Sequence, residues 1–347
     1  MLTMRCLFGD TPTQEFADYV ASCPDSLVYT TPRFLALVSG HLGAQGGWLE
    51  ARRQGLLVGL LPFLKKEGFL GPVLNSLAYY GSNGGVVQVD VDAEAKAGLI
   101  QAFYNEADKA GCASATIITN PLERDAEFYF KHANHDLLDE RIGLVTHFPT
   151  NANAEMLIKS FEDPRPRNIR RAIRDGITVQ RRQDIEALDF LYNTHCQNMQ
   201  AIGGLSKKKS FFDAIPDTMN EDDWSIHVGM KDGQPVAALL TFAFNQTVEY
   251  FTPVIREEFR STQALSLIIY QAMQDSIKRG FSNWNWGGTW LIQDGVYDFK
   301  KRWGTTQYSY YYFTRLFKAE VRRQTRQALL DGYEGFYVLP FSELTSA

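Results

Sequence analysis

The chain has 347 residues, which is long for one domain, so its length favours two domains. At 45% hydrophobic and 22% charged residues, its composition is typical of a soluble globular protein. The net charge of −5 argues against a generally cationic nucleic-acid binder, so any site for a polyanion must be a local basic patch.

Cysteine usage and the lengths of the apolar runs indicate the cellular compartment. Four cysteines are scattered along the chain without metal-type spacing: Cys6, Cys23, Cys112 and Cys196. They predict reduced thiols in a cytoplasmic protein that needs no metal. The apolar run before Gly9 is too short for a signal peptide, and no uncharged run approaches the length of a membrane span.

The first half begins with a predicted hairpin. A strand from Trp48 and a second strand ending near Phe63 flank a turn at Gln54 and Gly55. A helix is predicted over residues 93–109, and the strand 114–118 follows it.

A basic helix is predicted next, around residues 168–174. The stretch from 165 to 182 contains seven arginines against one acid, Asp175; they are Arg165, Arg167, Arg170, Arg171, Arg174, Arg181 and Arg182. Ile169 and Ile173 are expected on the buried face, with the arginines over the exposed side. Guanidinium groups suit phosphates, although a merely solvated basic face explains the pattern equally well.

The second half repeats the plan of the first. A hairpin with a turn near Asp232 precedes a strand over 247–253, the loop 256–262, a helix over 263–278 and a strand over 281–286. After Gly304 a strand is expected over 308–313, and a basic helix over 316–330. This repetition predicts a duplicated mixed α/β unit.

The end of the repeat carries a recognisable signature. Residues 299–304, Phe-Lys-Lys-Arg-Trp-Gly, resemble the motif of FemAB-like transferases, a branch of the GNAT acyltransferase superfamily. The basic helix with its glycine and strand, and the helical pair around residues 190–212, are similar to further parts of that family. The resemblance covers roughly residues 155–315.

This resemblance implies the fold and the domains. It implies an α/β (α+β mixed sheet) fold with two tandem GNAT-like domains, residues 1–150 and a catalytic domain 151–317, with 318–347 returning to the first. No long charged heptad run lies between Leu188 and Trp224, so the resemblance is to the family members without a helical arm.

The expected activity is N-acyl transfer to a primary amine. Acyl-CoA or aminoacyl-tRNA would serve as the co-substrate, with no tightly bound cofactor, and a small or cell-envelope precursor would be the acceptor. Aminoacyl-tRNA is the predicted donor. The alternatives are an acetyl-CoA-dependent N-acetyltransferase and a non-catalytic GNAT-fold binding module.

Two residues are predicted to be catalytic. Glu249, within an apolar strand, matches the position of a GNAT base that takes the proton from the attacking amine. Lys300 is expected to stabilise the oxyanion, and Phe299 to contact the donor's terminal adenosine. The alternatives are an exposed strand residue for Glu249 and an edge-strand lysine for Lys300.

The loop 256–262 is expected to bind the donor through Arg260, Ser261, Thr262 and Gln263. GNAT enzymes hold a pyrophosphate at such a helix start. The usual small residues are replaced by Gln263 and Leu265, which argues against a tight CoA cradle. A plain helix N-cap at Ser261 or Thr262 is the alternative.

The acceptor is expected to contact Arg170, Arg174, Lys207, Tyr250 and Trp290. Peptidoglycan-acting relatives carry a Trp followed four residues later by a Lys, where this chain has Phe34 and Val38. That departure argues against a muropeptide acceptor.

Overall fold

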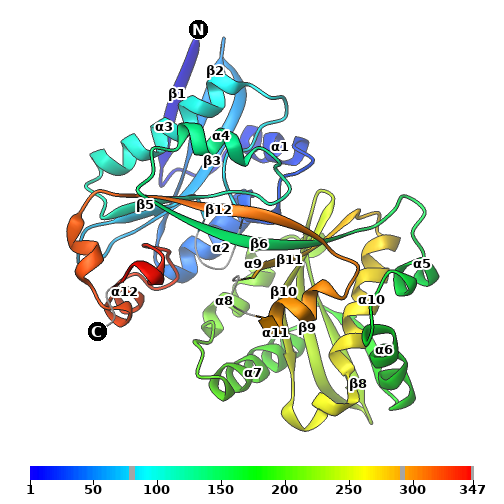
Figure 1. The fold of residues 1–347 in the computed structure, drawn as a ribbon. Coiled ribbons are helices and arrows are strands. Elements are labelled where there is room, and N and C mark those ends of the chain that lie inside the picture. Colours follow the sequence, from blue (N-terminus) through cyan, green and yellow to red (C-terminus); the bar gives the residue numbers. More distant parts are fainter. Residues whose placement is uncertain (78–82, 290–293, 345–347) are drawn as a thin grey trace. The chain divides into compact units, whose positions relative to one another are not determined.

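The computed structural model describes residues 1–77, 83–289 and 294–344, and it divides into two compact units (Figure 1). Unit 1 comprises residues 1–141 and 309–347, and unit 2 comprises residues 142–308. The predicted domain boundaries near residues 150 and 317 stay a prediction.

Unit 1 contains a mixed sheet. Its strands, in spatial order, are β1 (Leu2–Phe8), β2 (Gln45–Arg53), β3 (Leu56–Lys66), β4 (Val73–Asn75), β5 (Ser114–Ile118) and β12 (Thr306–Leu316). Neighbours are antiparallel except β4 and β5, which are parallel. Its helices are α1 (Gln14–Ser22), α2 (Pro32–Leu42), α3 (Ala93–Lys109), α4 (Ala126–His132) and α12 (Arg326–Gly332).

Unit 2 has the same arrangement. Its strands, in spatial order, are β7 (Thr178–Arg182), β8 (Trp224–Lys231), β9 (Gln234–Phe244), β10 (Thr247–Ile255), β11 (Asn283–Thr289) and β6 (Leu137–His147). Here β10 and β11 form the parallel pair, and the other neighbours are antiparallel. The helices are α5 (Ala154–Lys159), α6 (Arg165–Arg174), α7 (Ile185–Ala201), α8 (Lys209–Asp213), α9 (Ile215–Thr218), α10 (Ala264–Lys278) and α11 (Asp294–Lys301).

The repeat predicted from the sequence is therefore confirmed, as is the mixed α/β fold. In each unit the parallel pair is connected by a helix, α3 in unit 1 and α10 in unit 2. The last strand of each sheet is exchanged between the two halves of the chain. The strand that follows β5 in the chain, β6, pairs with β11, whereas the strand that follows β11, β12, pairs with β5.

Local sequence explains the matching hairpins. The β2–β3 turn places Gln54 at φ 54° and Gly55 at φ 87°, and the β8–β9 turn places Asp232 at φ 50° and Gly233 at φ 78°. Two consecutive residues of positive φ give the turn whose twist matches that of the flanking strands.

One predicted element is wrong. The expected helix over 316–330 is instead the end of β12, a short 3-10 turn (Ala319–Arg323) and α12. Thr325 causes the interruption, because its backbone is extended and its hydroxyl accepts a hydrogen bond from Ala328 N, which starts a new helix.

The core of unit 2 lies around α10 and the inner strands. Trp284, Trp286 and Trp303 are fully buried in it, as expected for packing residues. No helix in the described part of the chain is long and apolar enough to cross a membrane.

Candidate functional site in unit 2

The parallel pair of unit 2 is short. The β10–β11 register joins Thr247 to Asn283, Val248 to Trp284 and Glu249 to Asn285, and among the described residues it ends there. Both strands continue beyond that point, and β10 has an irregularity between Tyr250 and Thr252. The strands therefore separate just after Glu249.

Glu249 lies at this separation and is buried, with 1% of its surface exposed. The expected alternative of an exposed strand residue is wrong, because Glu249 is on a central strand between β9 and β11. Its neighbour Asn285 is also buried and accepts a hydrogen bond at Oδ1 from Gly287 N (3.0 Å). A carboxylate and an amide thus meet at the strand ends.

Lys300 lies in the last turn of α11 and is also buried. Its Nζ donates to Gly288 O (3.1 Å) and to Thr289 Oγ1 (3.3 Å). Burial lowers the pKa of this ammonium to about 8. The expected alternative, an edge-strand lysine, is wrong because the residue is helical and its ammonium is held over the end of β11.

Phe299 joins this region to α6. Its ring centroid is 6.4 Å from that of Trp286 and 6.1 Å from that of Trp303. The guanidinium carbon of Arg165 lies 4.3 Å from the Phe299 ring centroid, a cation–π contact. Tyr250 packs on Trp286 with 4.9 Å between ring centroids.

Arg165 is placed differently from the prediction. It is buried together with Ile169 and Ala172, whereas Ile173 is 56% exposed. The buried stripe of α6 therefore follows the i, i+4, i+7 spacing from Arg165, and the predicted pairing of Ile169 with Ile173 on one face is wrong. Arg165 and Ile169 have the spacing of one helix face, but arginine is rarely buried, so the sequence pattern does not predict a buried side chain at position 165.

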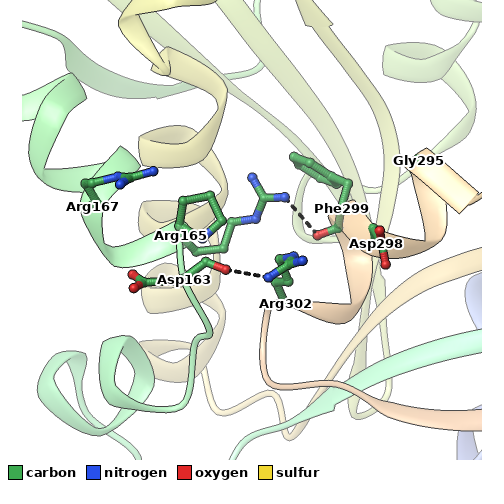
Figure 2. A pocket seen from close by; sticks show the side chains of 8 residues that line it. Asp163, Arg165, Arg167, Gly295, Asp298, Phe299 and Arg302 are labelled. Atoms are coloured by element: carbon green, nitrogen blue, oxygen red, sulfur yellow. Dashed lines mark hydrogen bonds between the residues drawn. The ribbon is translucent and has the colours of Figure 1, made fainter.

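An open pocket of about 520 Å³ adjoins Phe299 (Figure 2). Its lining residues come from the segment before α6, from α6 itself and from α11 and its end: Asp163, Pro164, Arg165, Arg167, Gly295, Asp298, Phe299 and Arg302. The sequence reading of the signature included Arg302 but gave it no role.

The predicted donor loop has an unusual helix start. Gln263 precedes α10 in a left-handed conformation (φ 61°), and no side chain caps the helix. Thr262 Oγ1 donates instead to Phe259 O (2.6 Å). The N-cap alternative for Ser261 or Thr262 is therefore wrong. Gln263 Nε2 donates to Arg260 O (3.2 Å), which holds the loop together.

The predicted acceptor residues do not form one surface. Arg170 and Arg174 are exposed on α6, which packs on α10. Lys207 precedes α8, and its backbone N donates to Nε2 of His195 in α7 (3.1 Å). Its Nζ lies 5.4 Å from the Phe251 ring centroid, and burial lowers its pKa to about 8. Trp290 lies outside the described residues.

The position expected to hold an acceptor lysine in unit 1 is closed. Phe34 and Val38 are buried on α2. In the part of the chain that the structure describes, no group of three metal-ligating side chains is found.

Comparisons with known proteins give one family match. Residues 165–301 match a protein family described as "Acetyltransferase (GNAT) domain". A comparison with curated protein sequences gives no match.

Solved structures resemble most of the chain. The crystal structure of FemX is 17% identical, with 88% of this chain and 96% of that one covered and a TM-score of 0.71. L-PGS from Bacillus licheniformis is 14% identical, with 90% and 94% covered and a TM-score of 0.56. A tandem GNAT protein from the clavulanic acid biosynthesis pathway is 10% identical, with 90% and 98% covered and a TM-score of 0.55.

Identities this low establish similarity of fold only. The family match, however, spans α6 to α11 and so contains Glu249, Phe299 and Lys300. Residues 165–301 thus form a GNAT acyltransferase domain, in a chain with the fold of FemX and of tandem GNAT proteins.

Proposed function

We propose that the chain is an N-acyltransferase that moves an aminoacyl or acyl group onto a primary amine. One observation carries the proposal: a buried ammonium, Lys300, and a buried carboxylate, Glu249, are both attached to β11 inside the GNAT domain. Glu249 pairs with Asn285, and Lys300 bonds at Gly288 and Thr289, three to four residues further along. Between these two attachment points β11 is irregular, with Gly287 at φ 69°.

Acyl transfer to an amine needs a base and an oxyanion stabiliser, and Glu249 and Lys300 have the chemistry for these two roles. The acceptor ammonium first loses a proton to Glu249, and the free amine then attacks the donor carbonyl. A new N–C bond forms while the carbonyl oxygen becomes an oxyanion. When the carbonyl reforms, the C–O bond of an ester or the C–S bond of a thioester breaks, the new amide nitrogen loses a proton, and the leaving group takes up that proton.

Lys300 is suited to the second role because it is fixed before the reaction. Its hydrogen bonds to Gly288 O and Thr289 Oγ1 use two of its three N–H donors. No described residue accepts from the third, which we assign to the developing oxyanion. A poorly hydrated ammonium stabilises an oxyanion more strongly than an exposed one. Its pKa of about 8 leaves it mostly protonated at neutral pH.

Aminoacyl-tRNA is the proposed donor. Gln263 and Leu265 stand where small residues let a pyrophosphate approach closely, and Phe299 offers an aromatic face for a terminal adenosine. The uncapped start of α10 supports the second candidate, an acetyl-CoA-dependent N-acetyltransferase, because free backbone amides at a helix start attract phosphate. The acceptor is proposed to be a small molecule or a cell-envelope precursor in the cytoplasm.

A transfer assay tests the proposal. Purified protein is incubated with a panel of amines and either tRNA charged with labelled amino acids or labelled acetyl-CoA, and the amide products are identified by mass spectrometry. We expect labelled amide from charged tRNA. Amide from acetyl-CoA alone would identify the second candidate. Donor binding without any amide from either donor would favour the non-catalytic binding module.

A further inference from the structure

Positive charge exceeds negative charge in the lining of the pocket beside Phe299. Arg165, Arg167 and Arg302 line it, and none of them forms an ion pair with another described residue. Two carboxylates, those of Asp163 and Asp298, also line it, and they too form no ion pair in the described ranges. Asp163 contributes its backbone oxygen instead, which accepts a hydrogen bond from Arg302 Nη1 (2.8 Å).

Arg165 is the unusual member of the set. Only 9% of it is exposed, and its Nε has no hydrogen-bond partner among the described residues. Its one hydrogen bond, from Nη2 to Phe299 O, is long at 3.4 Å. Figure 2 shows its guanidinium group and that of Arg302 beside the Phe299 backbone. Burial lowers the pKa of Arg165, and the positive charge of Arg302 lowers it further.

A buried charge without a counter-ion is costly, because the lost hydration is not replaced. Phe299 supplies a cation–π contact, but that interaction is worth only about 0.5–2 kcal/mol. An anion in the pocket would satisfy Arg165 Nε and offset the repulsion between the two guanidinium groups. The forked donors of arginine fit the oxygens of a phosphate.

The position of the pocket identifies which phosphate. Phe299 forms its wall and Lys300 is the next residue, with Cα atoms about 3.8 Å apart. The proposed function places the donor's terminal adenosine on Phe299, so a phosphate here is next to that nucleoside. In an aminoacylated RNA the ester and the nearest phosphate are attached to one ribose. In acyl-CoA the long pantetheine arm separates the thioester from the diphosphate.

We infer that Arg165, Arg167 and Arg302 bind the phosphate that precedes the terminal adenosine of an RNA donor, an assignment that rests on the proposed function. The pocket then selects an RNA donor over a CoA donor by the position of its phosphate. One face of the Phe299 ring then contacts the adenosine, and the other face contacts the Arg165 guanidinium.

Binding without chemistry tests this assignment. The probe is a fluorescent RNA hairpin ending in single-stranded CCA, competed by the dinucleotide CpA, by adenosine and by CoA. For the wild type we expect CpA to compete better than adenosine, because the two differ by the cytidine and the single phosphate that links it to the adenosine. Competition by CpA no better than by adenosine would overturn the assignment.

Variants then locate the phosphate. Arg302→Gln and Arg167→Gln change side chains that reach solvent, so both are expected to fold. Each should weaken hairpin binding about tenfold, the loss expected for a charge-assisted hydrogen bond, and reduce the salt slope by about 0.7 per lost phosphate contact. In Arg302→Gln the advantage of CpA over adenosine should disappear.

Arg181→Gln is the matched control, since Arg181 is a partly exposed arginine of unit 2 on β7, 3.7 Å from Asp275. Equal affinities of all three variants for the hairpin would overturn the assignment. A pocket substitution that weakened competition by CoA but not competition by CpA would overturn it too. Transfer from charged tRNA that is undiminished in Arg302→Gln would reject the pocket and leave the proposed function intact. Weakened hairpin binding in a protein that forms no amide would support the pocket and reject the proposed function.

Discussion

The two units share one topology but end their parallel strand pairs differently. In unit 1 the β4–β5 register joins Val73 to Ser114 and ends with Asn75 opposite Thr116. In unit 2 the equivalent register ends with Glu249 opposite Asn285. Both polar residues, Asn75 and Glu249, are buried. The Asn75 side chain pairs with the Tyr337 backbone: its Nδ2 donates to Tyr337 O (2.8 Å), and its Oδ1 accepts from Tyr337 N (2.9 Å).

The connecting helices differ in the same sense. Asp92 caps α3 by accepting from Ala95 N, and its carboxylate also accepts a hydrogen bond from Arg53 (3.0 Å). The equivalent helix α10 starts at Gln263 without a side-chain cap. A carboxylate at a helix start repels a phosphate, whereas a neutral residue does not. At these two positions unit 1 thus has an amide paired with the C-terminal segment and a capped helix, whereas unit 2 has a carboxylate and a helix without a side-chain cap.

The largest expected effect comes from Glu249→Gln, which makes the end of the unit 2 strand pair neutral, like that of unit 1. We expect kcat to fall by roughly 10²–10⁴-fold, because the acceptor ammonium loses its base. Part of the loss should return at higher pH, where free amine is more abundant. Steady-state measurements across the neutral pH range give kcat for both proteins. A variant kcat equal to that of the wild type throughout would show that a group of the substrate, and not Glu249, takes the proton.

Lys300→Met should lower kcat by roughly 10²–10³-fold, the loss expected for one oxyanion donor. Lys301→Met is the control, because Lys301 is exposed on the same helix. In the wild type, kcat should decline as pH rises through about 8, since the ammonium is the form that stabilises the oxyanion. Equal rates for the two variants would remove Lys300 from the mechanism.

Asn75→Ala tests the opposite side of the comparison. It should lower the free energy of unfolding by about 1–3 kcal/mol, because the backbone groups of Tyr337 lose buried partners. The kcat of the molecules that remain folded should not change. Urea unfolding and active-site-corrected rates measure both quantities, and a large fall in kcat would assign unit 1 a direct part in the reaction.

Acid should destabilise unit 2 through two buried histidines. Burial lowers the pKa of His195 to about 4 and also lowers that of His227. Above pH 6.5 both the folded and the unfolded protein hold these rings neutral. As pH falls from 6.5 toward 4, only the unfolded chain gains protons, so stability declines, by up to ~3 kcal/mol for His195.

Hydrogen exchange resolved by peptide checks this expectation. Amides of unit 2 should lose protection in that pH window, and His195→Gln should reduce the loss. Loss of protection in unit 1 with unit 2 unchanged would contradict the assignment to these histidines.

The smallest effect is expected at the start of α10. Gln263→Asp adds the charge that unit 1 carries there, and Gln263→Asn adds none, while both residues tolerate a positive φ. If CoA binds at this helix start, the Asp variant should bind it about two- to fivefold more weakly than the Asn variant. Calorimetry measures the CoA affinity of each variant. Equal affinities would show that CoA does not bind at the start of α10.

Local features of this fold were predictable from the sequence. The helix 93–109, the strand 114–118 and the turns at Gln54 and Asp232 follow from short-range patterns, and the structure has them at those positions. The signature 299–304 indicated Lys300, but its helical setting and its bonds to β11 depend on residues elsewhere in the chain. The burial of Arg165 against Phe299 joins residues 134 apart, and no local pattern encodes such a contact.

The exchanged last strands determine the order in which the chain can complete its parts during synthesis. All of unit 2 lies within residues 142–308, so it is fully translated before most of the strand that covers β5 exists. Until β12 emerges from the ribosome, β5 keeps an unpaired edge on that side, the kind of edge that recruits strands from other chains. The part of the protein that begins first is therefore the part that finishes last, and a nascent chain stalled before residue 306 would lack the strand that pairs with β5.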